Sequence, residues 1–263
     1  MHLYSYVKYI MVLIVVAASL TPAWALADPA KAGLEVAKKN DLANQGFGSE
    51  SSVMEMKLIN AHGDVTTRRM KSEVLEGSGE GDKSIVIFQW PADVKGTKML
   101  THSKKSSDDQ QWLFLPAIKR VKRISSRNKS GSFMGSEFSY EDLGSQEIEK
   151  FTYELLGEMK FEGRDVWHMK RIPTDKRSGY SKQIVWVDKG YNAPVKLEYY
   201  DRKGELLKTA IFSGFKQYGK FWRVGKIDVI NAQTRKQSVI TWSERTVGTE
   251  VDSENFDSDN LAD

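Results

Sequence analysis

Residues 109–143 read DQQWLFLPAIKRVKRISSRNKSGSFMGSEFSYEDL and place three different segments in a row. The first, QQWLFLP (110–116), is apolar at successive positions and ends at a proline. A sheet with one face in solvent alternates apolar and polar residues, so this pattern predicts a strand that meets apolar groups on both faces. We expect one face to pack on a helix and the other to line a cavity.

Segments with strand character lie on both sides of this stretch. The breaks between them carry turn residues, such as DRKGE (201–205) and QYGK (217–220). Short turns predict an antiparallel meander, and a sheet of about eleven strands curls or closes instead of staying flat. Pro29 to Gln45 predicts one helix before the strands, ending at Gly46. The expected strands cover 53–59, 65–75, 85–90, 97–104, 110–116, 151–157, 164–172, 182–188, 194–201, 205–217, 221–232 and 236–247.

The first 27 residues are typical of a secretory signal peptide. Lys8 precedes an apolar stretch, and Ala25-Leu26-Ala27 forms a small-x-small cleavage site; an uncleaved anchor is the alternative. The chain has no cysteine, so we expect neither disulfides nor the lipid anchor of a bacterial lipoprotein. The expected protein lies in the periplasm or outside the cell. It has a single domain over 28–251 and a flexible acidic tail over 252–263.

Most enzyme and metal-site patterns are missing from the sequence. The formal net charge of +4 is too small to predict a nucleic-acid partner. No G-x-S-x-G elbow or P-loop occurs, and Glu141 and Asp142 are adjacent instead of facing each other across a cleft. We therefore predict a protein without enzymatic activity, metal or cofactor. Zinc-ligand spacing is not found among the four histidines, which are His2, His62, His102 and His168.

Large apolar side chains are abundant, with 7 Trp, 11 Phe, 10 Tyr and 9 Met. Many of them fall on the expected strands, where they are either ordinary core or the lining of a cavity. Our candidates for the cavity lining are Phe88, Trp90, Met99, Trp112 and Phe114.

A basic run follows the strand at 110–116. Charged residues, lysine above all, keep an exposed sheet edge from pairing with other chains, so a solvated edge strand is one interpretation. The other is a docking patch for an acidic partner or an anionic headgroup, since each basic residue near a charged membrane contributes about 1 kcal/mol. The candidate docking residues are Lys119, Arg120, Lys122 and Arg123.

The loop GSFMGSEFSYEDL (131–143) combines glycines, which allow unusual backbone conformations, with large apolar residues. Ser139 is placed to cap a short helix that carries Glu141 and Asp142 in its first turn. We predict a lid over one mouth of the curved sheet, and a packed structural loop is the alternative. The lid residues would be Phe133, Met134, Phe138 and Tyr140.

The stretch from Asp109 to Leu143 resembles the signature of the outer-membrane lipoprotein-sorting protein-like family, which is related to the LolA and LolB carriers. Lys122 and Glu137 are conservative departures from that signature. The matching residues are Asp109, Leu113, Leu115, Pro116, Arg120, Val121, Arg123, Ile124, Ser132, Phe133, Met134, Gly135, Ser136, Phe138, Tyr140, Glu141, Asp142 and Leu143.

The resemblance implies a mainly β (α+β) fold: a half-open antiparallel β-barrel of about eleven strands, with helices over its concave face. It also implies a periplasmic carrier that binds lipid or lipidated protein beside an inner-membrane exporter of the resistance-nodulation-division type. We expect a monomer that contacts membranes transiently. The alternative is an accessory subunit of such an exporter whose cavity is filled by its own side chains. A hydrolase on a β scaffold is a third possibility, which the residues support little.

Overall fold

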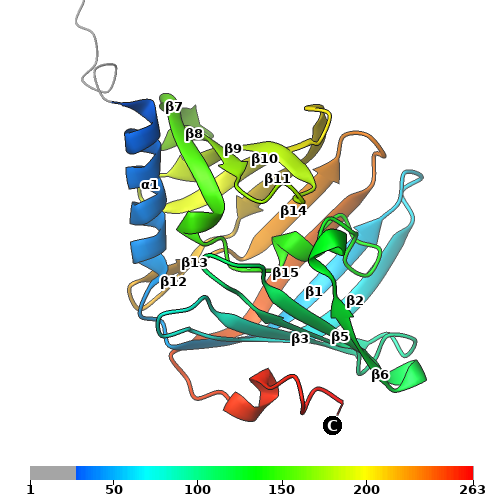
Figure 1. Cartoon of the computed structure of the whole chain (residues 1–263). Helices are drawn as coiled ribbons and strands as arrows, with labels where there is room; N and C mark the ends of the chain where they lie inside the picture. The colour runs from blue at the N-terminus through cyan, green and yellow to red at the C-terminus, as the bar shows by residue number, and fades with distance from the viewer. Residues whose placement is uncertain (1–27, 263) are drawn as a thin grey trace, which may run out of the picture.

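A computed structural model describes residues 28–262, so the predicted signal peptide at 1–27 lies outside the described residues. The chain forms one helix and a strongly curved antiparallel sheet (Figure 1). The helix and strands are α1 (Pro29–Asn44), β1 (Ser49–Ile59), β2 (Val65–Leu75), β3 (Lys83–Trp90), β4 (Lys98–His102), β5 (Gln110–Leu115), β6 (Arg120–Ile124), β7 (Phe151–Phe161), β8 (Arg164–Pro173), β9 (Tyr180–Asp188), β10 (Ala193–Asp201), β11 (Leu206–Ser213), β12 (Lys216–Tyr218), β13 (Phe221–Arg223), β14 (Lys226–Asn231) and β15 (Gln237–Val247).

The main sheet has 13 strands in the order β6-β5-β4-β3-β2-β1-β15-β14-β11-β10-β9-β8-β7. The predicted half-open antiparallel arrangement is confirmed, because β6 and β7 lie at opposite edges and are not paired. The meander is not strictly sequential, since β1 pairs with β15 in the middle of the sheet. Two strands that we predicted as continuous, 205–217 and 221–232, are each interrupted. The end of the first and the start of the second form the separate hairpin β12–β13. The breaks fall at Gly214, whose φ is 63°, and around Gly225.

Helix α1 begins where the sequence predicts. Pro29 occupies the first turn, and the Asp28 carboxylate accepts a hydrogen bond from the Ala30 N–H at 2.9 Å. The helix lies along edge strand β7. An ideal Cβ at Gly33 would lie 2.8 Å from the Leu155 backbone nitrogen, so glycine permits this close approach. Within the described part of the chain, no helix is both long and apolar enough to cross a bilayer.

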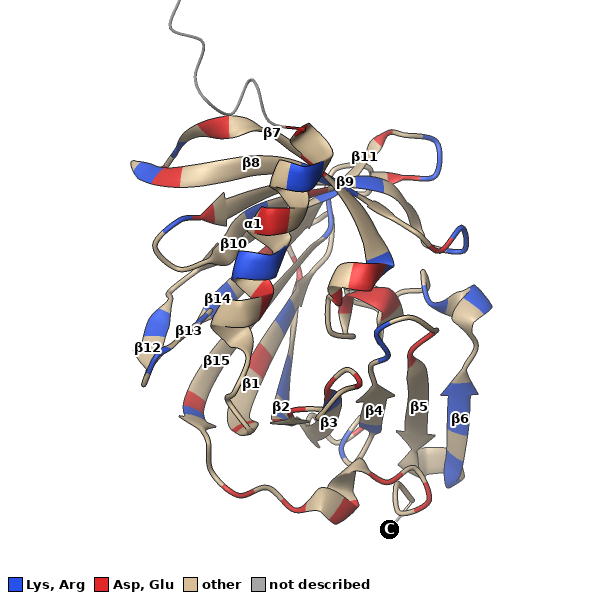
Figure 2. Cartoon of the chain, turned by 60° about the vertical axis from the view of Figure 1, so that its left-hand side comes forward, with Lys and Arg blue, Asp and Glu red and all other residues tan. Residues whose placement is uncertain are grey.

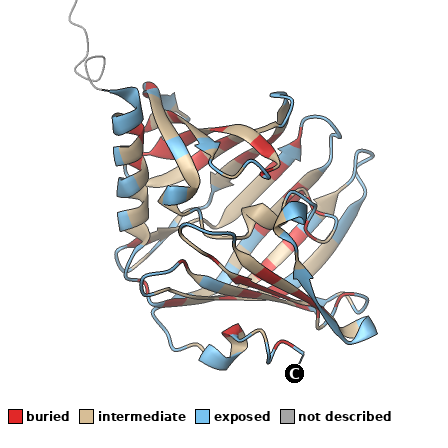
Figure 3. Cartoon of the chain, viewed as in Figure 1, coloured by how far each residue is buried: buried red, intermediate tan, exposed pale blue. Residues whose placement is uncertain are grey.

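The inner face of the sheet is the one that α1 and the loop 131–143 cover, and it carries the largest hydrophobic core (Figure 3). Met54, Met56 and Met70 are buried near the centre of the sheet. Phe133 and Phe138 join the same core from the loop. Methionine fills irregular gaps well, which suits a face covered by a loop instead of a regular element.

The outer face of β3–β5 is covered by the C-terminal segment, which we expected to be a flexible tail. Phe256 is 1% exposed and Leu261 is 2% exposed, and both pack against Leu100 and Phe114. Figure 1 shows this segment lying under β3 and β5. The segment is acidic, but its two large apolar residues have a hydrophobic surface to bury on, and this favours docking. The apolar pattern of QQWLFL therefore reflects a core on each face, covered by the loop 131–143 on the inner face and by the C-terminal segment on the outer face.

Candidate functional site

A cavity of about 690 Å³ lies on the inner face, in the other half of the sheet. Helix α1 forms one wall, and residues 138–149 form another. The volume falls within the range of about 300–1,000 Å³ that is typical of ligand pockets. The apolar side chains that line it include Val36, Met169, Val185, Val187, Leu197, Ala210, Phe212 and Ile227.

The register of the sheet brings an apolar row to the floor of this cavity. Met169 is opposite Val185, Val185 is opposite Leu197, and Leu197 is opposite Ala210. Directly opposed residues of antiparallel strands lie on the same face, so all four side chains point inward. Ala210 is the smallest of the four, and it leaves room beside α1.

A second row, two residues further along each strand, is polar. Arg171 is opposite Gln183, Gln183 is opposite Tyr199, and Tyr199 is opposite Lys208. Side chains in a strand alternate between faces, so this row also points inward and lies beside the apolar row. Arg171 and Tyr199 both line the cavity. The cavity is therefore amphipathic, with an apolar floor and a polar border.

Arg171 is a partly buried cation with neutral partners. Its Nε donates to Gln183 Oε1 at 2.5 Å and its Nη2 donates to Gln146 Oε1 at 3.0 Å. Its guanidinium lies 4.4 Å from the centre of the Phe151 ring. Burial lowers the pKa of Arg171, because a low-dielectric environment disfavours the charged form. Arginine nevertheless stays protonated at neutral pH, so a positive charge borders the apolar floor.

The other cation of this row is neutralised. Lys208 Nζ lies 2.6 Å from Asp142 Oδ2 and donates to the Glu137 carbonyl at 2.7 Å. Asp142 also accepts a hydrogen bond from the Tyr180 hydroxyl at 2.8 Å. These contacts fasten the loop 131–143 to strands β9 and β11. Tyr153 donates to the Ile148 carbonyl at 3.1 Å, and burial raises its pKa to about 12.

None of the five residues predicted to line the cavity does so. Phe88 and Met99 lie on the inner face, but the loop 131–143 fills the space above them, with the Phe133 ring 5.9 Å from that of Phe88. Trp112 and Phe114 point to the outer face, where they pack with the C-terminal segment. Trp90 is 51% exposed at the end of β3.

The loop 131–143 is anchored at several points. Phe133 is 1% exposed and Phe138 is 8% exposed, whereas Met134 and Tyr140 are partly buried. Gln111 donates to the Tyr140 carbonyl at 2.8 Å. Of the four predicted lid residues, only Phe138 lines the cavity. These contacts favour the packed loop over a mobile lid for most of the segment.

The predicted short helix is present at Tyr140–Asp142, directly after Ser139. The Ser139 N–H donates to Asp142 Oδ2 at 2.7 Å, so the Asp142 carboxylate within the helix caps its N-terminus. Met134 and Gly135 both have positive φ, 51° and 78°, at the tip of the loop. Glycine suits this conformation, whereas at Met134 the surrounding contacts must hold it.

The basic run forms edge strand β6, which is blue over much of its length in Figure 2. Arg120 and Lys122 are opposite Leu115 and Leu113 and so share the inner face, whereas Arg123 is opposite Trp112 on the outer face. The run is therefore split between two faces. All four predicted docking residues, including Lys119, are exposed, which is compatible with either sequence interpretation.

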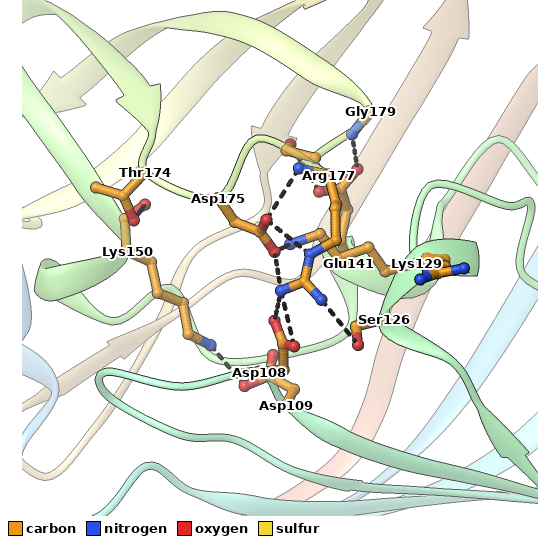
Figure 4. Close-up of polar contacts among 12 residues, drawn as sticks. Asp108, Asp109, Ser126, Lys129, Glu141, Lys150, Thr174, Asp175, Arg177 and Gly179 are labelled. Atoms are coloured by element: carbon orange, nitrogen blue, oxygen red, sulfur yellow. Dashed lines mark hydrogen bonds and ion pairs between the residues drawn. The ribbon is translucent and has the colours of Figure 1, made fainter.

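Ion pairs bridge the open side of the half-barrel (Figure 4). Arg177 Nη2 lies 2.7 Å from Asp108 Oδ1, and Lys129 Nζ lies 2.6 Å from Asp175 Oδ2. They join the loops beside β5 and β6 to the turn between β8 and β9. A second cavity of about 460 Å³, with a largely polar lining, adjoins this network. The two halves of the protein are thus held together here by charge.

Sequence reasoning missed the polar row and Arg171. One signal was present: in VWHMKRIP (166–173), Trp167, Met169 and Arg171 occupy alternate positions. A charged residue in an otherwise apolar alternation predicts a cation on the covered face. The sequence predicts the strand, and side-chain alternation along it places Arg171 on the same face as Met169.

The chain is similar to solved structures over most of its length. An outer membrane lipoprotein-sorting protein domain from Vibrio parahaemolyticus is 48% identical, with a TM-score of 0.87, over 89% of this chain and 100% of that one. A DUF1329 family protein from Desulfovibrio piger is 32% identical, with a TM-score of 0.85, over the same 89% and 100%.

Two further comparisons concern the fold and the family. A LolA superfamily protein from Nitrosomonas europaea is similar in fold, with a TM-score of 0.69 at 21% identity, over 89% of this chain and 99% of that one. A family model described as an uncharacterized protein matches residues 80–263. A comparison with curated proteins finds no match.

Proposed function

This chain belongs to the outer-membrane lipoprotein-sorting protein-like family, and we propose that it is a non-enzymatic carrier of lipid or of the acyl chains of lipoproteins. The acyl chain would lie in the cavity between α1 and strands β8–β11. The observation that supports this proposal is the row of apolar side chains across β8–β11, which begins at Met169 and ends at Ala210. An unfilled space of about 690 Å³ lies above this row.

The energetics of such binding are favourable. Each buried methylene contributes about 0.8 kcal/mol, so roughly 16 methylenes give about 13 kcal/mol before ordering costs. A net free energy near 12 kcal/mol corresponds to nanomolar affinity. Retaining the cargo is therefore easy, and releasing it requires a partner or a membrane that opens the cavity.

We place this activity in the periplasm, after export directed by the segment 1–27, with the carrier acting as a monomer between inner and outer membrane. An inner-membrane exporter of the resistance-nodulation-division type would supply or receive the cargo. The docking surface would include exposed Lys119, Arg120, Lys122 and Arg123 of the β6 region, which would contact anionic headgroups or acidic side chains transiently.

One observation favours a second function, that of an accessory subunit of the exporter. The loop 131–143 fills the inner face above β3–β5, with Phe133 only 1% exposed. Part of the concave surface is therefore occupied by the protein itself. In that case the remaining cavity would have no cargo.

Native mass spectrometry of gently purified protein distinguishes these functions. We expect lipid to co-purify with the wild type and to be reduced in Ala210→Trp, whose indole would occupy the cavity floor. Ala61→Trp, in the exposed turn between β1 and β2, is the matched control. A wild-type protein that is consistently free of lipid, under conditions that preserve lipid in a known carrier, would overturn the carrier function.

A further inference from the structure

Arg171 is a partly buried cation that lines the cavity, and its direct hydrogen-bond partners are all neutral. Its acceptors within residues 28–262 are the amide oxygens of Gln183 and Gln146. Lys208, in the same row, has the carboxylate of Asp142 at 2.6 Å. A partly buried charge whose direct contacts are all neutral dipoles is a costly arrangement for stability alone. It becomes favourable when a ligand supplies the missing anion.

We propose that the cavity binds an amphiphile with a single acidic headgroup, and that Arg171 pairs with the headgroup's carboxylate or phosphate. This inference rests on the proposed carrier function and names the class of cargo. The apolar row beside Arg171 would hold the hydrocarbon chain, and the polar row would hold the head. The planar guanidinium suits this role because it offers parallel N–H donors to two oxygens of one acid group.

The residues around Arg171 would allow it to exchange a glutamine oxygen for an oxygen of the ligand. Gln146 is less buried than Gln183, so its amide can rotate away from Arg171 and turn its NH₂ group toward an incoming anion. Gln183 is only 3% exposed, which keeps its amide at the guanidinium. Tyr199, next in the row, lines the same cavity, and burial raises its pKa, so its hydroxyl remains a neutral donor.

The rim of the cavity restricts which anions enter. Several of its carboxylates are fixed by local contacts: Glu76 accepts hydrogen bonds from the Gly46 and Gly48 N–H groups, each at 2.6 Å. An acidic rim gives no general attraction for anions, so binding depends on the direct contact with Arg171. A headgroup with several negative charges would be repelled. The carboxylates among the lining residues are Asp41, Glu76, Glu80, Asp82, Asp142, Glu147 and Glu149.

The test compares a fluorescent fatty acid, cis-parinaric acid, with its uncharged methyl ester on delipidated full-length protein at neutral pH. We expect the wild type to bind the acid about tenfold or more tightly than the ester, because a charge-assisted hydrogen bond has no counterpart in the ester. Arg171→Gln should remove this preference, so that affinity for the acid falls about tenfold more than affinity for the ester. The matched control is Lys170→Gln, which removes a cation from the adjacent, outward-facing position of β8.

A second variant keeps the test decisive if Arg171→Gln does not fold. Gln183→Glu places a carboxylate of nearly the same shape beside the guanidinium, and it should also abolish the preference for the acid. Equal affinity of the wild type for acid and ester, or a preference that survives both substitutions, would overturn the role of Arg171. Failure to bind either probe would instead contradict the carrier function.

The source of the acid group is settled in the same assay. Inorganic phosphate at millimolar concentration should not displace parinaric acid, because the chain provides most of the binding energy. Displacement by phosphate alone would show a site for a free anion and would overturn the assignment to an amphiphile.

Discussion

The two halves of the curved sheet have similar strands but different coverings. On β2–β5 the inner face is filled by the loop 131–143 and the outer face by the C-terminal segment. On β8–β11 the inner face is covered only at a distance, by α1 and residues 138–149, and a cavity of about 690 Å³ remains. The difference shows that apolar strands alone do not make a binding site. The site arises where the covering element stops short of the sheet.

The largest expected effect comes from emptying the filled half. Phe133→Ala removes a side chain that is 1% exposed and packs against Phe88 and Tyr140. We expect a loss of about 3–5 kcal/mol in the free energy of unfolding, as for other buried Phe→Ala changes. Chemical denaturation measures it. Trp90→Ala, at an exposed aromatic, should cost far less, and equal losses would show that the loop is not the core of this half.

The outer covering should contribute nearly as much. Phe256→Ala removes the main apolar anchor of the C-terminal segment. We expect a loss of about 3 kcal/mol or somewhat less, because a terminal segment can detach without unfolding the rest. Limited proteolysis should then cut the chain near residue 256 much faster than in the wild type. An unchanged cleavage rate would mean that the segment is held by other contacts.

A smaller effect is expected where α1 approaches the sheet. A Cβ at Gly33 would lie 2.8 Å from backbone atoms of β7, so Gly33→Ala forces the helix outward. Overpacking of this kind costs about 1–3 kcal/mol, offset in part by about 1 kcal/mol from the better helix propensity of alanine. The wall of the cavity should move, so ligand affinity should change more than stability does. Calorimetry with a fatty acid, beside thermal unfolding, compares the two.

The smallest effect concerns the ion pairs across the open side. Burial opposes ionisation of Asp175, but hydrogen bonds from Arg177 and Lys129 lower its pKa overall. A carboxyl whose pKa is lowered in the folded state stabilises the protein above its unfolded pKa, near about 4, and this stabilisation is lost as the pH falls further. In Asp175→Asn we expect a loss of about 1 kcal/mol at pH 7 and a smaller one at pH 3. A loss independent of pH would point to packing instead of charge.

The sequence predicted where most helices and strands lie, but it did not predict which face of the sheet each side chain occupies. The first helix, the β1–β2 hairpin and the strands around Trp112 were predicted because hydrophobic period and turn residues are local signals. The direction of Trp112 and Phe114 was not predicted, since QQWLFL is apolar at both parities and either face could be inward. Register decides the face, and register depends on partners far away in the chain.

The coverings of the two halves were equally hidden from sequence reasoning. The acidic composition of 252–263 indicated a solvated tail, yet Phe256 and Leu261 are buried against the outer face of the sheet. In contrast, the position of Arg171 is indicated by the sequence, because it follows Trp167 and Met169 at alternate positions of the same strand. The position of the cavity had no sequence signal, because it is defined by the absence of a covering side chain.

The pairing of β1 with β15 has a consequence for how the protein acquires its structure. Val53 is paired with Ser243, so the middle of the sheet is closed by pairing the first strand with the last strand in the chain. Contacts between residues this distant in sequence form slowly, because a long loop must close first. During synthesis, which starts at the N-terminus, β1 therefore remains unpaired on its β15 side until nearly the whole chain has emerged.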